Sequence, residues 1–114
     1  MINNKTQKLI SQHLKKHSKV LDVGGGKNPF NASTHIMDLS QPDNEKIKEL
    51  SDRLLNFKRE NYLVHDILDS PWPYEDKFFD FSICSQTLED LRDPLIVCKE
   101  LIRVSKAGFI SCPT

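Results

Sequence analysis

The stretch that decides the fold is Val20-Leu21-Asp22-Val23-Gly24-Gly25-Gly26-Lys27-Asn28-Pro29. A short apolar run stops at three consecutive glycines, which predicts a buried strand over 19–23 and then a loop with a bare backbone. In an open α/β sheet, ligands bind just beyond the carboxyl ends of the strands, where glycine lets the main chain approach them closely. The stretch therefore predicts a nucleoside-like ligand, although a glycine-rich turn after a strand is often only a turn.

Strands and helices alternate along the rest of the chain. Apolar runs predict further strands over 34–39, 62–65, 79–84 and 108–112. Helical spacing predicts helices over 4–17, from Ser40 through Leu54, and from Pro94 to Gly108 with Asp93 as N-cap. Since each strand is nearly continuously apolar, we expect an α/β fold with a Rossmann-like, doubly wound parallel sheet of about five strands, covered on both faces.

Length and charge limit the partners. The 114 residues carry 16 Lys and Arg against 16 Asp and Glu, with a pI near 6.9. We expect a single domain over 1–114, with no long-range field to attract nucleic acid or an anionic membrane. The sequence has no apolar run long enough to span a bilayer and no secretion signal at its start, so we expect a cytoplasmic protein.

Cysteine and histidine spacing does not indicate a metal site. The three cysteines lie far apart in the sequence, at Cys84, Cys98 and Cys112, and we expect buried free thiols rather than disulfides or zinc ligands. His13 and His17 lie one helical turn apart without a third ligand, which favours a polar helix face.

Two aspartates follow predicted strands and suit a nucleoside. Asp38 closes the second strand, where its carboxylate can accept from both ribose hydroxyls. Asp66 follows the third strand, where it can accept from an adenine amine while the backbone N–H of Ile67 donates to a ring nitrogen. Each aspartate could instead cap a helix or lie in a solvated turn. The glycine loop and the two aspartates, however, follow three successive strands, and together they favour a ligand.

Residues 19–112 resemble the class I S-adenosylmethionine-dependent methyltransferases, specifically the methyltransferase-11-like branch. Residues 22–26 are similar to that family's acidic, glycine-rich loop around the methionine part of the cofactor. Residues 72–81 are similar to its approach to the fourth strand, and residues 85–94 to the segment after it. The resemblance implies transfer of a methyl group from S-adenosyl-L-methionine to a small molecule. It implies cofactor binding by Asp22, Gly24, Gly25, Gly26, Asp38, Leu39, Asp66, Ile67 and Ser85.

The sequence departs from the family pattern in three ways. Residues 26–34 are too few for the usual crossover helix, so we expect an irregular loop. Gln86 and Asp90 stand where the family commonly has histidines. The chain stops after the fifth strand, whereas the family continues through strands six and seven. We therefore expect a truncated domain whose unpaired edge at 109–112 favours self-association, or which binds cofactor without methyl transfer.

The sequence leaves the catalytic residues open. His65, Glu89 and Asp90 are candidates for a general base, and Trp72 could flank a ligand or pack over a loop. A nicotinamide-dependent oxidoreductase is disfavoured, because its pyrophosphate needs a Gly-x-Gly-x-x-Gly turn entering a helix, and Pro29 with little chain behind it does not supply one. The alternative is an inactive methyltransferase-like scaffold or partner subunit that at most binds the cofactor.

Overall fold

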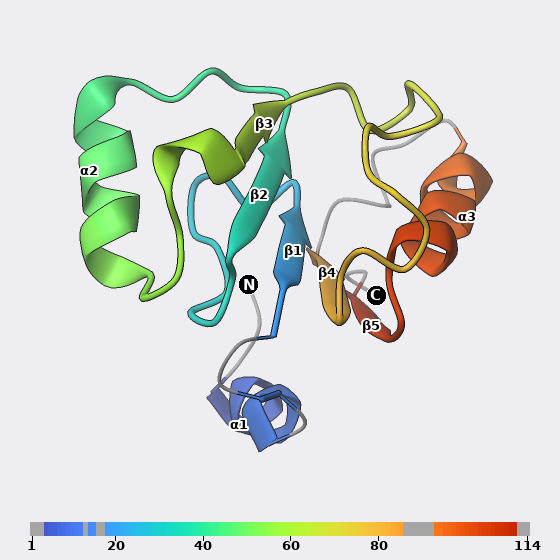
Figure 1. Cartoon of the computed structure of the whole chain (residues 1–114), viewed down its shortest axis with the longest axis horizontal. Helices are drawn as coiled ribbons and strands as arrows, with labels where there is room; N and C mark the ends of the chain where they lie inside the picture. The colour runs from blue at the N-terminus through green and yellow to red at the C-terminus, as the bar shows by residue number, and fades with distance from the viewer. Residues whose placement is uncertain (1–3, 13, 16–17, 86–92, 112–114) are drawn as a thin grey trace.

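The computed structural model of the chain describes residues 4–12, 14–15, 18–85 and 93–111. Within this part, five strands form one parallel sheet in the order β3-β2-β1-β4-β5 (Figure 1). The strands are β1 (Val20–Val23), β2 (His35–Asp38), β3 (Tyr62–Val64), β4 (Phe81–Ser85) and β5 (Gly108–Ser111). The strand order reverses direction between β1 and β4, so the carboxyl ends of these strands form the topological switch point. The predicted fold class is confirmed.

Three α-helices and one short 3-10 helix accompany the sheet in the described residues. They are α1 (Asn4–Gln12), α2 (Asn44–Arg53), η1 (Arg59–Asn61) and α3 (Pro94–Val104). In Figure 1, α2 and α3 flank the sheet on opposite sides. None of these helices is long and apolar enough to cross a membrane.

Side chains of the central strand alternate between the two faces. Leu21 and Val23 pack with Val97 and Leu101 of α3 in one apolar cluster. On the other face, Val20 packs in a second cluster with these residues: Ile10 of α1, Phe30 and Ile83. A third cluster holds Ile36 of β2 together with Ile47, Leu50 and Leu54, which lie on or just after α2. Both faces of the sheet are therefore covered, as the apolar strand pattern predicts.

Burial of the thiol is confirmed for Cys84 but not for Cys98. Cys84 is fully buried in the cluster beneath α3, and Cys98 is half-buried beside it. Neither forms a disulfide. Cys112, His13 and His17 lie outside the described residues.

The predicted start of α2 and the predicted end of α3 are wrong. Ser40 does not begin α2: the N-cap is Asp43, whose Oδ1 accepts from the backbone N–H of Lys46 at 2.7 Å. Pro42 explains the shift, because a proline disfavours helical geometry at the residue before it. At the other end of the chain, α3 stops at Val104 rather than continuing to Gly108. There Ser105 turns to extended geometry and pairs with Phe79.

The predicted helix over 4–17 is also shorter in the structure, where α1 ends at Gln12. Asp93 does cap α3 as predicted, accepting from the backbone N–H of Leu95 at 3.2 Å. β5 lies at one edge of the sheet, with Ile110 45% exposed. Association between copies through this edge stays a prediction.

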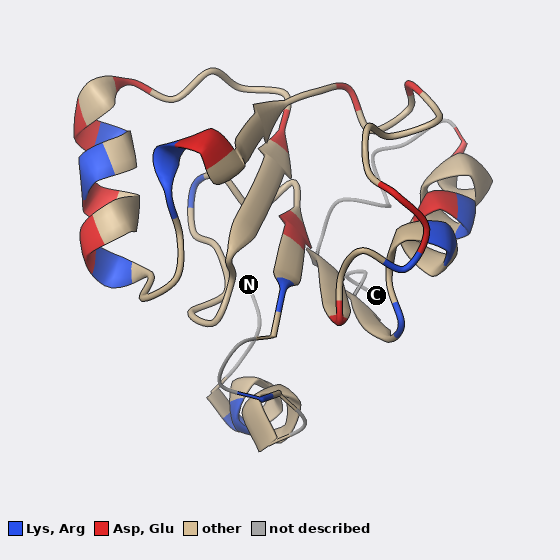
Figure 2. Cartoon of the chain, viewed as in Figure 1, with Lys and Arg blue, Asp and Glu red and all other residues tan. Residues whose placement is uncertain are grey.

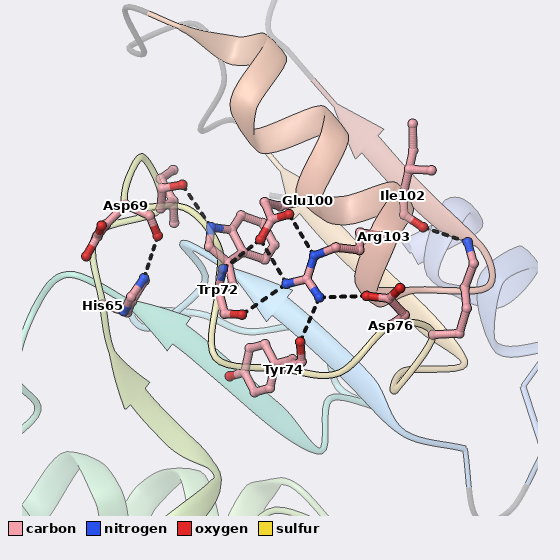
Figure 3. Close-up of polar contacts among 10 residues, drawn as sticks. His65, Asp69, Trp72, Tyr74, Asp76, Glu100, Ile102 and Arg103 are labelled. Atoms are coloured by element: carbon pink, nitrogen blue, oxygen red, sulfur yellow. Dashed lines mark hydrogen bonds and ion pairs between the residues drawn. The ribbon is translucent and has the colours of Figure 1, made fainter.

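A buried polar network joins the segment before β4 to α3 (Figure 3). The backbone N–H of Trp72 donates to Oε1 of Glu100 at 2.6 Å, and its indole N–H donates to the carbonyl of Ile67 at 2.9 Å. Arg103 binds Glu100 at 2.8 Å and donates to the carbonyls of Trp72 and Tyr74 at 3.0 and 2.8 Å. Trp72 is only 2% exposed and packs beneath the loop.

Removing Glu100 should destabilise the fold far more than removing the other carboxylate on Arg103. The Arg103 guanidinium holds the pKa of the buried Glu100 below its usual range. In Glu100→Ala the Trp72 N–H loses its acceptor, so we expect the free energy of unfolding to fall by about 2–4 kcal/mol. Asp76→Ala, which breaks an exposed ion pair to the same guanidinium, should cost less than about 1 kcal/mol. Chemical denaturation of both variants measures this, and equal losses would contradict a structural role for the network.

Candidate functional site

The three glycines after β1 lie where side chains do not fit. Gly24 has φ of +77°, a conformation that residues with a Cβ rarely adopt. A Cβ at Gly25 would collide with the carboxylate of Asp22. A Cβ at Gly26 would lie 2.6 Å from the Tyr62 hydroxyl oxygen and 2.7 Å from Oδ2 of Asp38. The bare backbone is therefore required by close contacts of the loop, and not only by a turn.

Two aspartates hold this loop. Oδ2 of Asp22 accepts from the backbone N–H of Phe30 at 2.8 Å, and Oδ2 of Asp38 accepts from that of Gly26 at 2.8 Å. The other oxygen of Asp38 accepts from the N–H of Ser40 at 3.1 Å. Since each carboxylate oxygen offers about two acceptor positions, Asp38 keeps capacity for further donors.

No helix connects β1 to β2, as the short spacing predicts. The connecting residues 24–34 form turns and bends, and α2 holds them from the side. Lys46 donates to the carbonyl of Lys27 at 2.7 Å. Arg53 donates to Oδ1 of Asn28 at 3.1 Å and to the carbonyl of Pro29. Side chains of α2 thus take over the ordering that a crossover helix would give this loop.

A cavity of about 930 Å³ opens beside the glycine loop. The structure brings these predicted site residues together in its lining: Asp22, Gly24, Gly25, Gly26 and Asp38. Leu39, Asp66 and Ile67 do not line it: Leu39 is 68% exposed, and Asp66 and Ile67 lie after β3. Ser85 ends β4 beside the end of β1, and its side chain is not described. Cofactor binding by all nine residues stays a prediction.

The cavity also contains residues that the sequence analysis did not select. Lys46 and Arg53 of α2 and Tyr62 of β3 line it. Tyr62 donates to the carbonyl of Ser40 at 3.0 Å, and burial together with the charge of Asp38 raises its pKa to about 12. Lys46 and Arg53 lie seven residues apart, about two helical turns, and so share one face of α2. The sequence shows that spacing, but charged residues of both signs occur along α2 (Figure 2). The spacing alone therefore does not distinguish Lys46 and Arg53 from the other charged residues.

The turn directly after β3 is closed by hydrogen bonds among its own residues. Oδ1 of Asp66 accepts from the N–H of Leu68 at 2.9 Å, and the carbonyl of Asp66 accepts from the N–H of Asp69 at 2.9 Å. His65 makes a 2.8 Å contact from Nε2 to the carbonyl of Asp69 (Figure 3) and does not line the cavity. The other base candidates, Glu89 and Asp90, lie outside the described residues. No group of three or more possible metal ligands occurs among the residues that are described.

Asp22 is the buried ionisable group of the cavity. Burial raises its pKa to about 7, against the lowering effect of the Phe30 N–H; Asp38 raises it further and Arg53 lowers it. The charged form is therefore disfavoured in the folded protein relative to the unfolded chain, where the pKa is near 3.8.

Asp22 should make the protein less stable as the pH rises. Because its pKa is higher in the folded state, the stability that protonation gives is present below about pH 4 and is lost as the pH approaches 7. A difference of one pKa unit between the folded and unfolded states corresponds to about 1.4 kcal/mol. At pH 8 the raised pKa of Asp22 therefore lowers the free energy of unfolding by on the order of a few kcal/mol. Asp22→Asn keeps an acceptor for Phe30 and should flatten this pH dependence, raising stability at pH 8.

Urea denaturation between pH 4 and 8 measures this effect. Asp52→Asn, which changes a carboxylate on the exposed part of α2, is the matched control and should keep the pH dependence of the unaltered protein. A parallel pH profile for Asp22→Asn and the unaltered protein would show that Asp22 is charged in the folded state.

Comparison with known proteins places this geometry in a family. The family model described as "Methionine biosynthesis protein MetW" matches residues 4–114. The chain belongs to this MetW family. The expected resemblance to class I S-adenosylmethionine-dependent methyltransferases is confirmed. The family whose model matches the chain is MetW. No curated protein sequence is similar enough to this MetW-family chain to count as a match.

Solved structures share the fold. The PH0226 protein from Pyrococcus horikoshii OT3 is 27% identical, with a TM-score of 0.64 over 92% of this chain and 53% of that chain. A methyltransferase from Aquifex aeolicus is 24% identical, with a TM-score of 0.56 over 90% of this chain and 58% of that one. A methyltransferase from Thermotoga maritima is 18% identical, with a TM-score of 0.59 over 88% and 44%. The MetW-family chain thus spans about half the length of these structures.

Proposed function

We propose that this MetW-family chain is a cytoplasmic S-adenosylmethionine-dependent methyltransferase whose acceptor is a small molecule. The observation that carries the proposal is the cavity at the carboxyl ends of β1 and β2, where Gly24–Gly26 and the carboxylate of Asp38 meet. Family membership and the fold of the methyltransferases support it.

The residues present fit the cofactor. The glycine cradle would be filled by any Cβ at Gly25 or Gly26, and Asp38 keeps acceptor positions for ribose hydroxyls. The cavity volume of about 930 Å³ lies within the range of roughly 300–1,000 Å³ that is common for sites of small molecules and cofactors. The cavity places carboxylate acceptors directly beside bare backbone, a combination that suits a nucleoside joined to an amino acid.

The role of the protein in the reaction is mainly positioning. The cofactor, when bound, supplies a methyl group already activated on a sulfonium, and the acceptor must approach in line with the sulfur–methyl bond. In the proposal, the backbone at Gly24–Gly26 follows the methionine end and Asp38 fixes the ribose. An acceptor that carries a proton must lose it to a base, and none of the cavity residues is assigned that role.

The second candidate is a chain that binds the cofactor without transferring the methyl group. It is favoured by Gln86 and Asp90, which stand where the family commonly has histidines. Titration with S-adenosylhomocysteine and a labelled-methyl assay on candidate small molecules separate the two. Binding with transfer supports the enzyme, whereas binding without transfer to any acceptor supports the second candidate.

Asp38→Ala should weaken S-adenosylhomocysteine binding by about ten- to a hundredfold, because charge-assisted hydrogen bonds to the ribose are lost. Calorimetric titration measures the affinity. Asp52→Ala, an exposed carboxylate on α2 outside the cavity, is the control and should bind as the unaltered protein does. If the folded, unaltered protein shows no affinity for S-adenosylhomocysteine, the proposed function is wrong.

A further inference from the structure

A second cavity lies at the opposite end of the sheet from the glycine loop. It has a volume of about 220 Å³ and lies between the last turn of α3 and the first residues of β4 and β5. Leu101 of α3 lines it on one side, and Ser82 and Gly108 of the sheet line it on the other. None of the described residues lines both this cavity and the one at Gly24–Gly26, so the two are separate places to bind a ligand.

The start of β5 leaves space beneath α3. Residue 108 is a glycine, and a Cβ at this position would lie 3.0 Å from the hydroxyl oxygen of Ser82, its partner in the parallel ladder. Ile110 is two residues further along β5 and therefore on the same face. Ile110 also lines the cavity and is 45% exposed. α3 thus leaves part of β5 uncovered.

A buried hydroxyl of this cavity has no partner among the described residues. Ser105 directly follows α3, lines the cavity and is only 4% exposed. Its side-chain oxygen makes no hydrogen bond within the described part of the chain. Buried hydroxyl groups in folded proteins are normally hydrogen-bonded, because they lose their contacts with water on folding. A polar group of a ligand in the cavity would supply the missing partner.

Two cations border the cavity, and none of the described residues that line it is acidic. The ammonium group of Lys77 donates to the carbonyls of Ile102 and Ser105 at 2.6 and 3.1 Å. These contacts hold it beside Ser105 and leave one of its three donors unused. Lys106 lies 3.3 Å from Oδ1 of Asp80, with the two side chains 63% and 39% exposed, and such surface ion pairs are weak. The positive charge is therefore available to an anion.

The remaining side chains around the cavity are apolar: Leu101, Ile102, Ala107 and Ile110. A cavity of about 150 Å³ with an apolar lining binds benzene, so about 220 Å³ has room for roughly eight or nine non-hydrogen atoms. The lining thus combines hydrogen-bond donors and positive charge with apolar surface. A small molecule that has a carboxylate at one end and an aliphatic chain at the other matches both parts.

We propose that this cavity binds a short-chain aliphatic carboxylate. The unused donor of Lys77 and the hydroxyl of Ser105 bind the carboxylate oxygens. The aliphatic chain packs against Leu101, Ile102 and Ile110. This site goes beyond the proposed methyl transfer and does not depend on it, because it lies at the amino ends of β4 and β5.

The test compares hexanoate with hexanamide, which have the same chain and nearly the same shape but differ in charge. Each is titrated at neutral pH into the isotope-labelled full chain, and the backbone amide signals are followed by NMR. We expect hexanoate to shift signals of residues 105–110. We also expect it to bind at least about tenfold more tightly than hexanamide, because only hexanoate forms charge-assisted hydrogen bonds.

Three variants test the assigned contacts. Lys77→Met keeps most of the aliphatic stem and should weaken hexanoate binding by about tenfold while leaving that of hexanamide within about twofold. Ser105→Ala should weaken hexanoate binding by about three- to tenfold. Ser33→Ala is the matched control, since it also removes a buried hydroxyl without a described partner, but outside this cavity, and it should leave the hexanoate affinity unchanged. Circular dichroism shows whether each variant is folded.

The comparison of the two ligands on the unaltered protein needs no variant, so the proposal can fail even if a variant does not fold. Equal affinity for hexanoate and hexanamide would show that the cavity has no anion site. Shifts confined to residues 22–43 would place hexanoate at the glycine loop, and no saturable binding would show that the cavity takes only water. Each of these results overturns the inference, and none of them bears on the proposed function, which the titration with S-adenosylhomocysteine tests.

Discussion

The connection between β1 and β2 is the constraint on which the rest of the site depends. Two parallel neighbours are joined by residues 24–34 without a helix, although such crossovers are usually helical. The backbone N–H groups of this loop must find partners elsewhere, because unpaired buried donors are costly. Some donate to backbone carbonyls, as Gly24 does to Met37, and two donate to carboxylates of the two strands: Asp22 accepts from Phe30, and Asp38 accepts from Gly26. The same carboxylates therefore shape the cavity and order the loop.

Because Asp22 and Asp38 both hold the same loop, two carboxyl groups lie near each other in the cavity. Asp22 is buried almost completely, and burial together with the nearby charge of Asp38 raises its pKa. Arg53 of α2 partly offsets this, because its charge lowers the pKa of Asp22. The cavity is therefore lined by both acidic and basic side chains.

The connection between β3 and β4 is held by side chains of α3. Between β3 and β4, segment 65–80 contains no helix, and its geometry depends on buried hydrogen bonds from Trp72 to Glu100 and Ile67. Arg103 closes this network by binding the carbonyls of the segment and the Glu100 carboxylate. Ile67 lies within the same network, so the loop predicted to contact adenine is tied to α3. Both loops at this end of the sheet are therefore ordered by side chains of the helix beside them.

The sequence by itself determined the strands, the parallel sheet and the place of the glycine loop, because apolar runs and glycines report local constraints on burial and backbone. The small number of residues between the first two strands also predicted that no helix connects them. The sequence misplaced the start of α2 at Ser40 and the end of α3 at Gly108, where Asp43 and the pairing of Ser105 decide the boundary. Only the tertiary structure showed that Lys46, Arg53 and Tyr62 line the cavity. Their positions depend on how α2 and β3 pack against a loop distant in sequence, and no local pattern encodes that contact.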